Sequence, residues 1–181
     1  MPLDEDVLIG TQDLINMLID GWDSPVILGL HSRIDAIYPN KNTLVISRHP
    51  SHRLPNEVGI KVPLEQPVIA VYDLDADIDR IFHKDRLPNS GGMGSPATSN
   101  RYGWFKEWTV QIDVFGRTLP ETRDIADTVE SELVDFCQQI WDNLRIRIRL
   151  IMPFYGLMTT SQLEAYHKYA RVRVTTFQKK E

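Results

Sequence analysis

The chain has 181 residues, a length that fits one domain able to bury a single sizeable core. Its hydrophobic content of 42% and charged content of 25% are typical of a globular protein, and no apolar run approaches the roughly 20 residues that a membrane-spanning helix needs. The net charge of −5 argues against a dedicated nucleic-acid binder, which would be basic. The acidic start MPLDED lacks the basic residues that open a signal peptide, so we expect synthesis in the cytoplasm.

The first predicted element is a short amphipathic helix. Thr11 is a candidate N-cap, and Gly21 and Ser24-Pro25 end the helix. Its apolar residues share one face: Leu14, Ile15, Leu18, Ile19 and Trp22. The apolar run 26–30 that follows predicts a short strand.

Two more strands are predicted before residue 75. Residues 44–47 form one, and the polar, turn-rich residues 48–55 follow it. Residues 68–72, bracketed by Pro63 and Pro67, are apolar on both faces. Such a strand is expected inside a sheet and not at its rim.

Residues 83–103 are rich in Gly, Pro, Ser and Asn and have almost nothing to bury, which predicts an extended loop. Within it, residues 91–94 (GGMG) resemble part of a phosphate-binding loop. Such a loop needs a strand before it and a helix after it, but Pro96 and further polar residues follow, so we interpret this stretch as a linker.

A strand and a long helix are predicted over residues 105–143. Residues 107–114 alternate between apolar and polar, as in a half-buried strand. Thr118 and Glu121 form a capping box, and Pro120 suits the first helical turn. The apolar stripe of this helix comprises Ile125, Val129, Leu133, Phe136, Cys137, Ile140 and Trp141. Its remaining surface carries the acidic residues Asp124, Asp127, Glu130, Glu132 and Asp135.

Two alternating strands are predicted near the C-terminus. Residues 145–150 alternate arginine with Ile or Leu, and residues 166–177 alternate in the same way. Between them we expect a turn at residues 153–156 and one helical turn at 161–165. The element order predicts a single α+β domain over residues 1–181. It would have a mixed or antiparallel sheet, a long amphipathic helix and a short N-terminal helix packed on one face, and the long inserted loop at 83–103.

Two patterns suggest a metal site, and both lack essential residues. The aspartates of residues 73–79 resemble the start of a calcium loop, but Ile78 and Lys84 stand where that loop needs glycine and glutamate. His49 and His52 have a chelating spacing only on a helix, which Pro50 disfavours. We therefore predict no metal and no cofactor.

The remaining reactive side chains also favour structural roles. The lone Cys137 lies on the apolar stripe and is interpreted as a small core residue. Lys106 and Glu107 are adjacent on a strand and project to opposite faces, so they cannot cooperate as in a nuclease. The isolated histidines are interpreted as surface or strand-face residues: His31, His83 and His167. We therefore predict no catalytic residues.

Arginines form the strongest remaining pattern. Arg147 and Arg149 line one face of a predicted strand, and Arg171 and Arg173 line one face of another. If these strands pair, one face of the sheet is basic. This face either keeps the sheet from aggregating or meets an acidic partner, such as a neighbouring subunit's helix or passing DNA. Opposite charges on different sides of one molecule favour head-to-tail association, which closes into rings when the rotation allows.

The segment WTVQIDVFG at residues 108–116, followed by the helix with Ala126 and Val129, resembles the tail-terminator or tail-completion family of tailed-bacteriophage neck proteins. This resemblance implies a hexameric ring that terminates the tail tube, joins it to the head–tail connector and lets genomic DNA pass through its lumen. It also implies a virion protein of the tail or neck, assembled in the host cytoplasm.

We therefore expect a non-enzymatic virion structural protein with no membrane partner. The alternatives are a head-completion or connector adaptor of the same neck and, less favoured, a small metal-dependent enzyme. The residues expected to contact partners or neighbouring subunits are Arg86, Arg101, Arg147, Arg149, Arg171, Arg173, Glu130 and Asp135.

Overall fold

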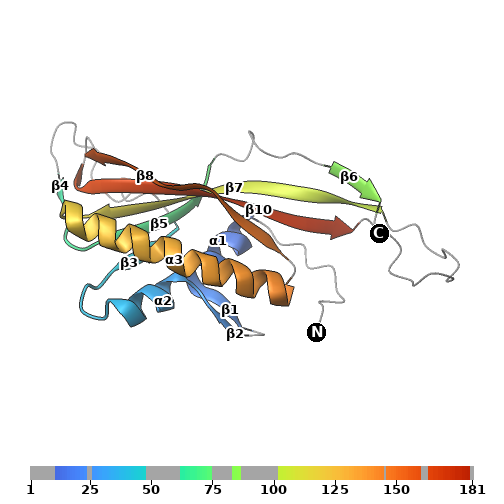
Figure 1. The fold of residues 1–181 in the computed structure, drawn as a ribbon, viewed down its shortest axis with the longest axis horizontal. Helices are drawn as coiled ribbons and strands as arrows, with labels where there is room; N and C mark the ends of the chain where they lie inside the picture. The colour runs from blue at the N-terminus through green and yellow to red at the C-terminus, as the bar shows by residue number, and fades with distance from the viewer. Residues whose placement is uncertain are drawn as a thin grey trace, which may run out of the picture.

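In the computed structural model, a long β-sheet is covered on one face by helices (Figure 1). The structure describes residues 11–23, 26–47, 62–74, 83–86, 102–144, 146–159 and 163–179. The helices are α1 (Thr11–Asp20), α2 (Leu30–Ile37) and α3 (Leu119–Leu144). The strands are β1 (Gly21–Asp23), β2 (Val26–Leu28), β3 (Leu44–Ile46), β4 (Val62–Pro63), β5 (Val68–Asp73), β6 (His83–Arg86), β7 (Tyr102–Gly116), β8 (Arg147–Thr159), β9 (Leu163–Glu164) and β10 (Tyr166–Lys179). The predicted α+β class is confirmed.

The main sheet has the strand order β3-β5-β7-β10-β8, and β6 pairs with β7 beside this path. Only the β3–β5 pair is parallel, so the sheet is mixed. Strand β5 lies inside the sheet, as its apolar faces predicted, and β8 is the last strand at one side. Two smaller pairs accompany the sheet: the antiparallel hairpin β1–β2 and the parallel pair β4–β9.

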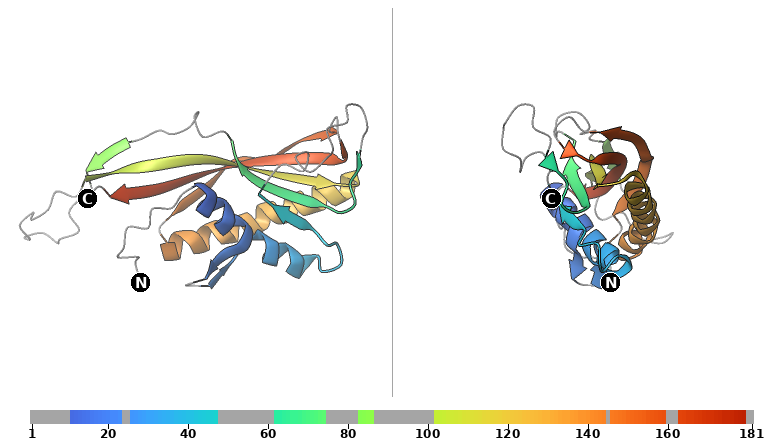
Figure 2. Two further views of the ribbon diagram at one scale, coloured as in Figure 1. Left: turned by 180° about the vertical axis from the view of Figure 1, so that it is seen from behind. Right: turned by 90° about the vertical axis from the view of Figure 1, so that its left-hand side faces the viewer.

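Strand β7 organises the sheet because it is the longest strand and has partners on both sides. Strand β10 pairs with it along its length, so β5 and β6 share its other edge, one after the other. Where β6 pairs with β7, the sheet extends past the helices as a narrow arm (Figures 1 and 2). Residues 83–86 and 102–103 are therefore strands, and the predicted loop over 83–103 is wrong at both ends because backbone pairing continues there; residues 87–101 lie outside the described part.

The main core lies between the sheet and the helices. Alternate residues of β7 and β10 point into it, together with the apolar stripe of α3. The central α3 residues Ile125, Val129, Phe136 and Ile140 are fully buried. Full burial of such side chains contributes about 1.5–3 kcal/mol each, so this stripe is the main force that holds α3 on the sheet.

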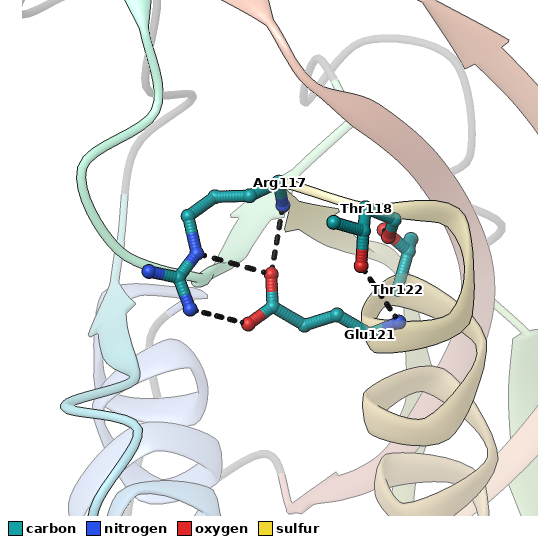
Figure 3. A network of polar contacts seen from close by, with 4 residues as sticks. All are labelled: Arg117, Thr118, Glu121 and Thr122. Atoms are coloured by element: carbon teal, nitrogen blue, oxygen red, sulfur yellow. Dashed lines mark hydrogen bonds and ion pairs between the residues drawn. The ribbon is translucent and has the colours of Figure 1, made fainter.

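The junction between β7 and α3 begins the helix much as the sequence predicted (Figure 3). Thr118 Oγ1 accepts a hydrogen bond from the Glu121 backbone N–H at 3.3 Å. The Glu121 carboxylate, however, accepts from the backbone N–H of Arg117 at 2.8 Å and from its guanidinium at 2.7 Å. The predicted reciprocal bond is therefore displaced by one residue, because the carboxylate binds the arginine side chain and backbone together.

Three predictions near the ends of the chain are wrong. Residues 153–156 continue strand β8 and do not form a turn. Pro153 is tolerated because β8 is the last strand of the sheet, where proline can lack a backbone hydrogen bond to a neighbouring strand. Gly156 adopts φ +76° near the register shifts between β8 and β10, as at a β-bulge. Leu163 and Glu164 form a strand with β4 and not a helical turn, since that pairing satisfies their backbone. Helix α2 replaces the end of the predicted strand 26–30, because Leu30 and Ile34 bury one helical face.

Candidate interaction surface

The predicted arginine face is present on the side of the sheet that α3 does not cover. Arg149 lies directly opposite Arg173 in the β8–β10 pair, so their side chains share that face with Arg147 and Arg171. The Arg171 guanidinium is half-buried and donates to Gln111 Oε1 at 3.4 Å. The other three arginines are exposed, and no described carboxylate forms an ion pair with them. This part of the face therefore carries unneutralised positive charge.

The predicted acidic residues lie on the opposite side of the molecule, on α3. Asp124, Asp127 and Asp135 are exposed. Glu130 is half-buried, and its carboxylate accepts from the Phe154 backbone N–H of β8 at 3.3 Å. Glu130 is thus engaged within the subunit, whereas Asp135 is available to a partner.

Two further predicted contact residues lie near or beyond the described chain. The backbone of Arg86 pairs with Tyr102 at the end of β6. Arg101, Arg145, His49, His52 and residues 75–79 and 91–94 lie outside the described residues.

A groove between α3 and β8 was not predicted. It has a volume of about 560 Å³ and lies beside β8, the last strand in the described order of the sheet. Its walls are Leu133, Val134, Cys137, Gln138, Trp141 and Glu130 from α3, and Arg147, Ile148, Arg149, Leu150 and Val172 from the sheet. Val134 is 63% exposed and Trp141 44% exposed, so the prediction that Trp141 belongs to the buried stripe is wrong. The groove could have been suspected from Val134, because it is an apolar residue that lies beside the apolar stripe of α3 in the sequence pattern.

Cys137 lies in the wall of this groove and is partly buried. Burial disfavours the thiolate and raises the pKa of the thiol to about 11. The side chain is therefore a poor nucleophile and a contact residue of the core, as the sequence indicated.

A second feature that sequence reasoning missed is a buried polar cluster around Asp113. We expected residues 107, 109, 111 and 113 to face solvent, but Asp113 is fully buried. The Tyr72 hydroxyl donates to Asp113 Oδ2, and Gln111 Nε2 donates to Asp113 Oδ1 and to the Tyr72 hydroxyl, each at 2.9 Å. Nε2 of His167 lies 3.2 Å from Asp113 Oδ1.

A second apolar cluster surrounds this polar cluster at one end of the helix-free face. Its buried members come from β3, β5 and β7 and from the residue between β9 and β10: Ile46, Val68, Ala70, Phe115 and Ala165. The His167 ring stacks on Phe115 with centroids 4.5 Å apart. Burial and the neighbouring Asp113 raise the pKa of Tyr72 above its ordinary range, so the hydroxyl stays protonated and donating. These polar contacts connect β5, β7 and β10, so the cluster has a structural role.

Among the described residues, no three His, Cys, Asp or Glu side chains come together as a metal site. No described helix is long and apolar enough to span a membrane. Glu107 is half-buried and accepts a hydrogen bond from Thr175 Oγ1 at 3.4 Å. The surface features with chemical character are therefore the arginine face and the groove.

No protein-family model and no curated protein matches the chain.

Proposed function

We propose that this protein is a virion structural protein that forms a ring at the head–tail junction of a tailed bacteriophage, where it terminates the tail tube and joins it to the connector. The observation that carries the proposal is the separation of unlike surfaces. Exposed arginines without carboxylate partners lie on one face of the sheet, and exposed aspartates with an apolar groove lie on the helix side.

Two unlike surfaces on opposite sides of a subunit favour a head-to-tail contact, and a closed ring satisfies both surfaces in every subunit. The arginine face would then meet either the neighbouring subunit or the DNA in the lumen. The phage assignment itself comes from the resemblance of residues 108–133 to the tail-terminator family.

Assembly of purified protein with phage tail tube protein tests the proposal. We expect closed rings by electron microscopy and tubes that stop growing when the rings bind. A protein that forms rings but binds only connector components would instead be the neck adaptor. Tight binding of Ca²⁺ or Mg²⁺ in calorimetry, with no assembly, would favour the metal-dependent enzyme.

A double substitution, Arg149→Ala with Arg173→Ala, tests the arginine face. Like charges directly opposite each other in an antiparallel pair are destabilising, so the subunit should be at least as stable as the natural protein while rings become fewer. Arg123→Ala is the matched control, because Arg123 is exposed on the helix side. Ring formation by the double variant equal to that of the control would remove the arginines from the assembly contact.

A further inference from the structure

We propose that the β1–β2 hairpin of one copy of this chain docks into the groove between α3 and β8 of the next copy. This inference rests on the proposed function and deepens it, because it names a contact between neighbouring subunits that involves the groove on the helix side.

The groove offers an apolar floor, arginines at its border and a free strand edge. Ile148, Leu150 and Val172 line it from the sheet. Arg147 and Arg149 border it on β8, and their side chains project from the opposite face of that strand. Among the described strands, β8 pairs with β10 alone, so the backbone groups of its other side are available to a further strand. Pro153 interrupts that edge only beyond the residues that line the groove.

The hairpin has the complementary chemistry. Val26 is 79% exposed and Leu28 is 52% exposed, whereas Ile27 between them is buried in the core. The exposed residues Asp20 and Asp23 flank the hairpin with negative charge. An exposed apolar strand with acidic neighbours therefore matches an apolar groove bordered by arginines.

The hairpin is also held rigidly, which lowers the entropy lost on docking. Arg33 Nε donates to the Leu28 carbonyl oxygen at 2.7 Å, and its guanidinium pairs with Glu132 of α3 at 3.0 Å. Gly21 adopts φ +95°, and a Cβ there would collide with the Ile27 carbonyl oxygen, so only glycine permits this tight pairing.

The positions of the two surfaces require two molecules. Helix α3 packs against both β8 and β2. Figure 2 shows the hairpin away from β8, so α3 separates it from the groove. A hairpin therefore cannot fill the groove of its own subunit. Pairing of two β8 edges across a twofold axis would bring Arg147 and Arg149 of both copies together, and that like-charge repulsion favours the acidic hairpin as occupant.

Cysteine cross-linking between two different variants tests this contact. Both variants carry Cys137→Ala to remove the natural thiol; one adds Val26→Cys, and the other adds Val134→Cys in the groove wall. Mixed and oxidised, with and without tail tubes, they should give a disulfide-linked dimer at least about tenfold above the yield of either variant alone. A chain with both substitutions should give a ladder of linked subunits.

The matched control replaces Val134→Cys with Asp127→Cys, an exposed position two helical turns away that does not line the groove. It should cross-link at background level. Arg149→Glu in the groove partner should lower the yield about tenfold, and Asp23→Arg in the hairpin partner should restore it.

The outcomes separate this contact from the proposed function. Rings without a Val26→Cys to Val134→Cys cross-link would overturn the contact and leave the function standing. A predominant homodimer of the Val134→Cys variant would overturn it in favour of edge-to-edge pairing. A strong, charge-dependent cross-link without rings or capped tubes would support the contact and refute the phage function.

Discussion

Substitution of Val129 by aspartate tests whether α3 is held on the sheet by its buried stripe. Val129 is fully buried in the middle of α3 and belongs to the main core. Its replacement removes about 1.5–3 kcal/mol of hydrophobic burial. The introduced carboxyl must also be buried, and holding a group of ordinary pKa about 3.9 neutral at pH 7 costs about 4 kcal/mol. The total of about 6 kcal/mol is comparable to the whole stability of many domains.

The matched control is Val134→Asp, the same substitution on the same helix at a position 63% exposed. It should change the free energy of unfolding by less than about 0.5 kcal/mol. Urea unfolding followed by tryptophan fluorescence and circular dichroism measures both variants. Because burial raises the pKa of the introduced carboxyl in the folded state, Val129→Asp should recover about 4 kcal/mol relative to the natural protein between pH 7 and pH 4. A loss below about 2 kcal/mol at pH 7, or no recovery in acid, would refute the packing of α3 described above.

Three further predictions concern the helix cap, the cysteine and the tyrosine. Thr118→Ala should lower the free energy of unfolding by about 1 kcal/mol, because the Glu121 N–H loses its acceptor. Thr118→Ser keeps a hydroxyl and should cost little in the same urea titration. Equal losses for the two variants would show that Thr118 does not cap α3. Cys137 should react with iodoacetamide at pH 8 about 100-fold more slowly in the folded than in the unfolded protein, since burial raises the pKa of its thiol to about 11; equal rates would contradict that burial. Stability should fall as the pH rises above about 10, because the raised pKa of Tyr72 disfavours the phenolate in the folded state, and Tyr72→Phe should remove this part of the pH dependence; an unchanged pH profile would refute the bond to Asp113.

The sequence predicted best those elements whose periodicity has one explanation. Strand β10 and the central part of β7 alternate strictly, and α3 carries a continuous apolar stripe after a capping signal. These patterns predict that one face of each element is buried, and in the structure those faces do form the core. The shared arginine face was predicted on the condition that the two C-terminal strands pair, and β8 and β10 do pair, with Arg149 opposite Arg173.

The errors arose where local signals depend on position in the sheet. Pro153 and Gly156 usually mark a turn, but a strand at the free edge of a sheet tolerates both residues. The burial of Asp113 could not be predicted from alternation, because the residues that cover it come from distant strands. The groove was missed for a related reason: it exists only where the exposed side of α3 meets the edge of β8.

The helix-free face of the sheet is divided in its chemistry, and this division bears on the proposed assembly. Toward one end, Phe115 and Ala70 are buried and Asp113 satisfies its hydrogen bonds within the subunit. Farther along this face, on β8 and β10, Arg149 and Arg173 lie opposite each other, exposed and without a described carboxylate partner. Solubility alone needs no such pair, because mixed charges would keep the edge from aggregating without repulsion. In the proposed assembly, an acidic surface of a neighbouring copy would neutralise this pair.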